Sequence, residues 1–127
     1  MAHMINRMPT IRVAAMPKDS NAAGDIFGGW IMSQVDIAAS IAAHRHAGGR
    51  VVTVAVNSFQ FKQPVFIGDL VSCYAEVVKT GTTSMTVEVE VYAERNRIES
   101  PIKVTEATLT FVAVDEHRKP RPIKLVD

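Results

Sequence analysis

The longest apolar pattern in the sequence runs from Gly28 to about His46. It contains no proline and no glycine after Gly29, is rich in alanine, and is followed by Gly48 and Gly49, as is typical of the end of a helix. Its apolar residues lie around nearly the whole circumference, and a helix of this kind is usually covered on all sides. We therefore expect one long helix, wrapped by a curved sheet and covered for the rest by a second copy of the chain.

Most of the remaining chain has the β-branched or alternating pattern of strands. Valines at positions 87, 89 and 91, for example, alternate with polar residues at 86, 88 and 90. Short connections between the later strands favour antiparallel pairing. The predicted class is α+β, with strands at about residues 6–15, 51–61, 70–79, 82–92 and 103–114.

Asp36 is the only ionisable residue between Gly29 and His44 in the predicted helix, and its only acidic residue. An unpaired carboxylate in an apolar setting is costly, so something must compensate for its burial. One interpretation is an aspartate that is partly exposed or paired with a basic residue from a strand. The other is a general base or nucleophile held in a dry cleft.

The glycine pair Gly28-Gly29 offers unobstructed backbone N–H groups at the positive end of the helix, where an oxyanion can bind. Glycine pairs also serve simply to let a loop pass closely into a helix. Asp36 follows Gly28 by eight residues, or about 12 Å along the axis. If both act on one substrate, the acid must come from a neighbouring subunit.

Size and charge narrow the functional class. The 127 residues suit a single domain, 1–127, in which the charged, proline-containing segment 116–127 is expected to be a loose tail. A net charge of +1 argues against a dedicated nucleic-acid-binding protein.

Cysteine content and hydropathy bear on the compartment. A single cysteine, Cys73, excludes an intramolecular disulfide and fits a reducing compartment. There is neither a membrane-length apolar segment nor a signal-peptide pattern, so we expect a cytoplasmic protein without membrane association. Met4 reads as the native start, which would make residues 1–3 a cloning remnant.

The segment MPKDSNAAGDIFGGWIMSQVD, residues 16–36, resembles the signature of hot-dog acyl-CoA thioesterases, most closely the bacterial YciA type. Further similar segments follow in the same order: RVVTVAV at 50–56, residues 61–69, GTTS at 81–84 and FVAVD at 111–115. The resemblance covers about residues 12–122.

This resemblance implies a hot-dog fold, with one long central helix wrapped by a curved five-stranded antiparallel sheet. It implies hydrolysis of acyl-CoA to free CoA and a carboxylic acid, without a metal or organic cofactor, as part of fatty acid metabolism. The helix aspartate and loop asparagine of the family match Asp36 and Asn21, which come from facing subunits. Many relatives carry histidine where this chain has Phe27, so that position is given no acid–base role. A homodimer is expected, assembled into a hexamer as a trimer of dimers.

On this hypothesis, the Gly28 and Gly29 N–H groups hold the thioester oxygen and Asn21 orients the water or the carbonyl. Asp36 acts as general base or as nucleophile, which the sequence does not decide. Binding of the CoA phosphates requires basic and hydroxyl groups. The candidates are Gly81, Thr82, Thr83, Ser84, Arg50 and Lys62, although solvated surface residues and turn threonines would look the same.

Two other functions remain open. A hot-dog dehydratase would use a histidine before the helix, but no histidine lies between His3 and His44. A non-catalytic acyl-CoA binding or regulatory module could keep both Asn21 and Asp36. The acyl-chain length cannot be predicted, since it depends on the depth of a tunnel.

Overall fold

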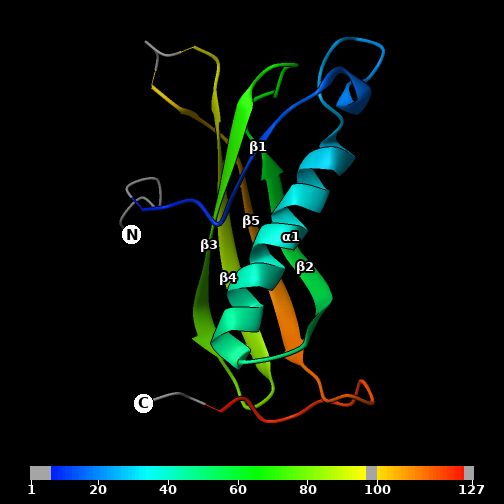
Figure 1. Cartoon of the computed structure of the whole chain (residues 1–127), viewed down its shortest axis with the longest axis vertical. Coiled ribbons are helices and arrows are strands. Elements are labelled where there is room, and N and C mark those ends of the chain that lie inside the picture. Colours follow the sequence, from blue (N-terminus) through cyan, green and yellow to red (C-terminus); the bar gives the residue numbers. More distant parts are fainter. Residues whose placement is uncertain (1–6, 97–99, 125–127) are drawn as a thin grey trace.

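A computed structural model describes residues 7–96 and 100–124 of the chain. Its elements are β1 (Ile11–Ala14), the short 3₁₀ helix η2 (Pro17–Asp19), α1 (Gly28–Ala47), β2 (Val51–Phe61), β3 (Leu70–Thr80), β4 (Ser84–Glu94) and β5 (Ile102–Ala113). The strands form one antiparallel sheet in the order β1-β3-β4-β5-β2. Helix α1 lies along one face of this sheet (Figure 1). The predicted hot-dog architecture is therefore confirmed.

The ends of α1 follow from the residues around them. Phe27 precedes the helix and provides no side-chain cap. At the other end, Gly48 adopts a left-handed conformation with φ of 68°, and its N–H donates to the carbonyl of His44. Glycine enters this region without a steric penalty, so it stops the helix where the sequence predicts.

Two terminal segments differ from expectation. The first strand is shorter than the predicted 6–15 and comprises Ile11–Ala14, while residue 6 lies outside the described residues. The expected loose tail, as far as residue 124, is held against the domain. Arg121 N–H donates to Ala113 and Ile123 N–H donates to Thr82. Ile123 also packs on the core.

The core lies between α1 and the inner face of the sheet. Small and branched helix residues are buried there, and they meet inward-facing residues of β4 and β5 such as Val87, Leu109 and Phe111. The small side chains let the helix approach the strands closely. The buried helix residues are Ile31, Val35, Ala38, Ala39, Ala43 and Ala47.

The edge strand β2 and the adjoining side of α1 are uncovered in the single chain. Within residues 7–96 and 100–124, strand β2 pairs with β5 alone, and its register shifts at two places. Val54 and Val56 on this strand are 54% and 49% exposed, and Ile37 on α1 is 47% exposed. A long, apolar edge is a template for pairing with another chain. This side of the molecule therefore fits the expectation that a second copy completes the cover of the helix.

Candidate active site

Asp36 lies in the middle of α1, partly buried, next to β2. Its Oδ1 accepts a hydrogen bond of 2.7 Å from Thr53 Oγ1. Among the described residues it forms no ion pair with a lysine or arginine. The carboxylate is thus fixed by a neutral hydroxyl and is partly exposed, which is one form of the first interpretation, whereas pairing with a basic residue from a strand receives no support.

Asn21 organises the loop that leads into the helix. Its Oδ1 accepts hydrogen bonds from the backbone N–H groups of Ala23 at 2.9 Å and Asp25 at 3.1 Å. Such a side-chain-to-backbone turn is typical of asparagine. Since the carbonyl oxygen is used within the loop, the side-chain amide N–H groups are the part of Asn21 that remains to bind a substrate or water.

The two glycines at the helix start have different surroundings. A Cβ on Gly28 would lie 3.2 Å from the Phe61 ring, so close packing alone explains glycine there. A Cβ on Gly29 would meet nothing within 4 Å, and Gly29 does not have a positive φ. Among the described residues, therefore, nothing requires glycine at position 29.

The N–H groups of Gly28 and Gly29 have no hydrogen-bond acceptor among the described residues, whereas those of Trp30 and Ile31 donate to the carbonyl of Phe27. The first N–H groups of a helix lack internal partners and carry its positive partial charge. This end of α1 can therefore accept a developing oxyanion.

A cleft of about 360 Å³ lies beside this helix start. Asn21, Gly28, Phe61 and Lys62 all contribute to its lining. Asp36 is absent from it, as expected from a position about 12 Å further along the helix axis. A single chain thus brings together the predicted asparagine and glycine but leaves the acid apart.

The predicted CoA-binding residues divide between the two ends of the molecule. The turn Gly81–Ser84 lies at the C-terminal end of α1, where Thr80 Oγ1 shares a hydrogen bond with His46 Nε2. The backbone of this turn already forms hydrogen bonds within the chain. The carbonyl of Thr83 accepts from the N–H of Ala113, and the carbonyl of Thr82 accepts from the N–H of Ile123. Arg50 lies at the same end.

Arg50 lines a second cavity, of about 400 Å³, between α1 and β2. The other residues lining it are Ser40, Ile41, His44, Arg45 and Val51. Lys62 lies at the opposite end, where its Nζ is 3.5 Å from Glu106 Oε2. The structure therefore does not bring Arg50 and Lys62 together within one chain.

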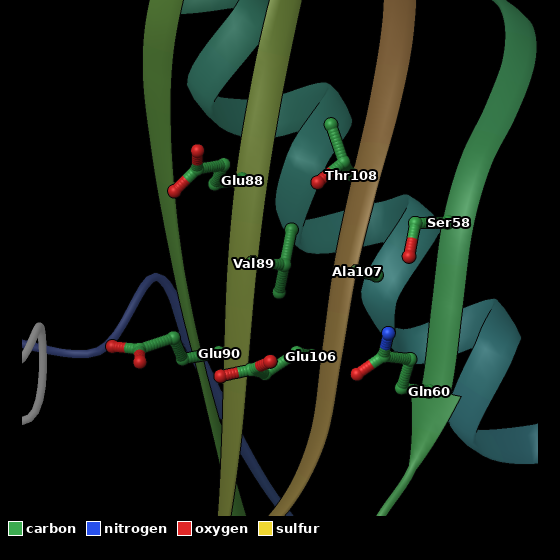
Figure 2. Close-up of a pocket in the computed structure, with 8 residues that line it drawn as sticks. All are labelled: Ser58, Gln60, Glu88, Val89, Glu90, Glu106, Ala107 and Thr108. Atoms are coloured by element: carbon green, nitrogen blue, oxygen red, sulfur yellow. The ribbon is translucent and has the colours of Figure 1, made fainter.

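Glu106 belongs to a charged cluster on the outer face of the sheet. Figure 2 shows the pocket there, with α1 behind the strands and Ser58, Gln60, Glu88, Glu90, Glu106 and Thr108 around it. Lys103 Nζ lies between Glu90, at 2.6 Å, and Glu106. Hydrogen bonding to Lys103 lowers the pKa of Glu106. The cluster and α1, which carries Asp36, therefore lie on opposite faces of the sheet (Figure 2).

Sequence reasoning missed two functional contacts. Thr53 belongs to no sequence motif that marks it as functional. Its hydrogen bond to Asp36 becomes visible only when β2 packs against α1. Asp69 is 3% exposed and binds the N–H of Phe66 and the guanidinium of Arg95, which lies over the Phe66 ring. Arg95 thereby holds the turn beside the cleft.

Cys73 is buried, and burial raises the pKa of its thiol to about 12, as expected for an inert core cysteine. Within the described residues, no group of three or more His, Cys, Asp or Glu side chains is arranged to hold a metal ion. None of the described helices is long and apolar enough to span a membrane.

The sequence profile of the thioesterase superfamily matches residues 23–100. The acyl-CoA thioester hydrolase YciA of Salmonella typhimurium is 52% identical over 117 residues, which cover 89% of this chain and 87% of the relative. A hexameric hotdog fold thioesterase of Campylobacter jejuni is 50% identical, with a TM-score of 0.88 over 91% of this chain and 90% of its own.

A more distant structure carries ligands. The acyl-CoA hydrolase of Staphylococcus aureus, in complex with butyryl coenzyme A, coenzyme A and coenzyme A disulfide, is 33% identical. Its TM-score is 0.86 over 92% of this chain and 71% of its own. Variants of that enzyme with an aspartate or an asparagine replaced by alanine have also been solved. The chain therefore belongs to the thioesterase superfamily: it has the hot-dog fold, and the YciA acyl-CoA thioester hydrolases are among its relatives.

Proposed function

We propose that this chain hydrolyses acyl-CoA thioesters at a site shared by two copies. Its relatives support the reaction class, and the S. aureus variants concern the two residue types on which the proposal depends. One observation carries the shared site: Asp36 is held by Thr53 at an uncovered edge strand, while Asn21 and Gly28 line a cleft elsewhere on the chain.

An antiparallel pairing of β2 with its counterpart would complete the site. Thr53 binds Asp36, and Phe61 packs on Gly28 at the other end of the strand. A two-fold axis exchanges equivalent positions, so an axis midway between Thr53 and Phe61 places Thr53 opposite the partner's Phe61. That midpoint, position 57, lies next to the central residue of β2. Asp36 would then approach the partner's helix start.

In this arrangement the thioester oxygen accepts hydrogen bonds from the N–H groups of Gly28 and Gly29. Such donors are worth a few kcal/mol when charge develops on the oxygen. The amide of Asn21 donates to the attacking water or to the carbonyl. Thr53 is a positioning residue, because its bond to Oδ1 of Asp36 leaves Oδ2 to take part in the reaction.

Two routes lead to the same products. As general base, Asp36 takes a proton from water while the water oxygen bonds to the carbonyl carbon. The tetrahedral intermediate then collapses, the C–S bond breaks, and the thiolate recovers the proton. As nucleophile, Asp36 itself displaces the thiolate, and water hydrolyses the resulting anhydride. Both routes need only water and side chains of the protein, so we propose that no cofactor takes part.

The assembly and the location are also proposed. The C. jejuni relative is hexameric, which supports a hexamer for this chain. We propose a trimer of dimers, each dimer formed through β2, in which Arg50, Lys62 and the turn Gly81–Ser84 bind CoA. We further propose that the protein acts in the cytoplasm on acyl-CoA of fatty acid metabolism.

Thiol release from acetyl-, butyryl-, hexanoyl- and palmitoyl-CoA tests the reaction. The wild-type protein should release CoA thiol with some of these chain lengths, whereas Asp36→Asn should bind CoA and release almost none. Tight binding of acyl-CoA by the wild-type protein without thiol release would instead identify a binding module.

A further inference from the structure

Arg95 lies outside the cleft at the start of α1 but close to its wall. It follows the last residue of β4, and Asp69 precedes the first residue of β3. Because Leu70 pairs with Glu94, the register of the sheet brings Arg95 and Asp69 together. Arg95 does not line the cleft, so any effect it has on the reaction must pass through other residues.

The guanidinium group of Arg95 holds one segment, residues 64–69, which we call the cleft turn. Its Nε donates to Asp69 Oδ2 at 3.2 Å, and its Nη2 donates to the carbonyl of Pro64 at 2.5 Å. Its Cζ also lies 4.4 Å from the centre of the Phe66 ring. Asp69 Oδ2 accepts in addition from the N–H of Phe66, at 2.9 Å. One side chain thus ties both ends and the middle of the cleft turn together.

The cleft turn in turn holds the loop that carries Asn21. The carbonyl of Val65 accepts from the N–H of Ile26 at 2.8 Å, and Phe66 forms an isolated β-bridge with Asp25. Asp25 is bonded to Asn21 twice. Its carbonyl accepts from the Asn21 N–H at 2.7 Å, and its own N–H donates to Asn21 Oδ1 at 3.1 Å. A continuous series of contacts therefore leads from Arg95 to Asn21.

The loop before α1 has few other anchors in the single chain. Within residues 16–27, all of which the structure describes, Ile26 is the only buried residue. Segments with few buried contacts open most easily. Val65, on the cleft turn, is also buried, so loss of Arg95 should loosen the loop without detaching it.

Arg95 also has a purely structural explanation, because it pairs with the buried carboxylate of Asp69. That explanation accounts for the ion pair but not for the bond to Pro64 or the position over the Phe66 ring. It predicts a change in stability alone, whereas a role in the reaction predicts a change in kcat when stability is restored.

We propose that Arg95 is a positioning residue for the reaction: it fixes the cleft turn, and the cleft turn fixes Asn21 against the bound thioester. This role rests on the proposed thioesterase function, since Asn21 orients the water or the carbonyl there. A displacement of about 1 Å in such a group can cost up to about a hundredfold in rate.

The test uses the double variant Arg95→Met with Asp69→Asn, which leaves no unpaired charge buried and should remain folded. The amide at position 69 can still accept from the Phe66 N–H. With hexanoyl-CoA, kcat should fall roughly tenfold while KM changes little. Arg95→Lys keeps Asp69 paired but lacks the planar fork, so it should show a smaller fall in kcat.

Arg121→Met is the matched control. Arg121 also donates to two backbone carbonyls, those of Val114 and Ala47, but at the C-terminal end of α1. This variant should lose stability and keep its kcat. An equal fall in kcat in the Arg121 variant would overturn the proposed role of Arg95, because any loss of stability would then slow the reaction.

Amide hydrogen exchange, followed by NMR, locates the effect without any turnover. In the double variant the N–H groups of Asp25 and Ile26 should exchange faster, while those of a central strand residue such as Val89 should not. Unchanged exchange at both loop positions, or faster exchange with an unchanged kcat, would contradict the proposed role. The proposed function fails separately, if the wild-type protein releases no thiol from any acyl-CoA.

Discussion

The hydrogen bond from Thr53 to Asp36 gives a quantitative test of the active-site geometry. Replacing Thr53 by valine removes the hydroxyl and keeps the shape of the side chain. Thr53 is exposed on β2, and valine is a favourable strand residue, so the fold and its stability should be little affected. The change therefore isolates a single hydrogen bond of 2.7 Å to the carboxylate.

A hydrogen bond to a charged group typically contributes about 1.5–3 kcal/mol. Because 1.36 kcal/mol corresponds to a factor of ten in rate, losing the orientation of the carboxylate should lower kcat by about ten- to a hundredfold. The lower end is expected, since Asp36 is only partly buried and water can replace some of the lost bond. KM should change little, because Thr53 does not bind the substrate.

Steady-state thiol release from hexanoyl-CoA provides the assay, with thermal unfolding as a check on the fold. Thr53→Ser is the matched control, because it retains the hydroxyl and should keep most of the activity. If Thr53→Val were as active as the wild-type protein, the hydrogen bond would have no part in catalysis. A loss in Thr53→Ser alone would instead point to packing of the threonine methyl group, which valine keeps.

Three further predictions concern the surroundings of the site. Gly29→Ala should leave the unfolding free energy unchanged or slightly raised, because a Cβ meets nothing and alanine favours helix, yet it should lower kcat/KM by obstructing the bound carbonyl. Arg95→Met should lower the free energy of unfolding by about 3–5 kcal/mol in denaturant titrations, because it leaves the buried carboxylate of Asp69 unpaired. The pKa of Glu106 is lowered by Lys103, so its stabilising contribution is present above the ordinary glutamate pKa and is lost as the pH falls through its folded pKa. Unfolding at decreasing pH should therefore show a smaller loss of stability in Glu106→Gln than in the wild-type protein, and equal losses would contradict this.

The sequence alone predicts the helix and strands well because their signals are local. Gly48 ends α1 as expected, and strand 51–61 has the predicted bounds, since β-branched residues and glycine act within a few residues of themselves. The first strand was predicted too long because nothing local distinguishes the short part that pairs with β3 from its flanks.

The candidate site was predictable only in part. Asp36 is conspicuous as the single acidic residue of an apolar helix, but its partner Thr53 depends on how β2 packs against α1. Lys62 was expected at the CoA phosphates, whereas its Nζ lies near Glu106, which only the sheet register brings close.

The claim that the site is shared between two copies can be tested by mixing two inactive variants. Asp36→Ala and Asn21→Ala are each expected to be nearly inactive and folded. After joint unfolding and refolding, a mixed dimer has one site with both residues intact, so random pairing should restore about a quarter of the wild-type activity. Recovery of that activity is the predicted result, and a mixture that forms mixed dimers but stays inactive would show that Asp36 and Asn21 do not meet across a subunit interface.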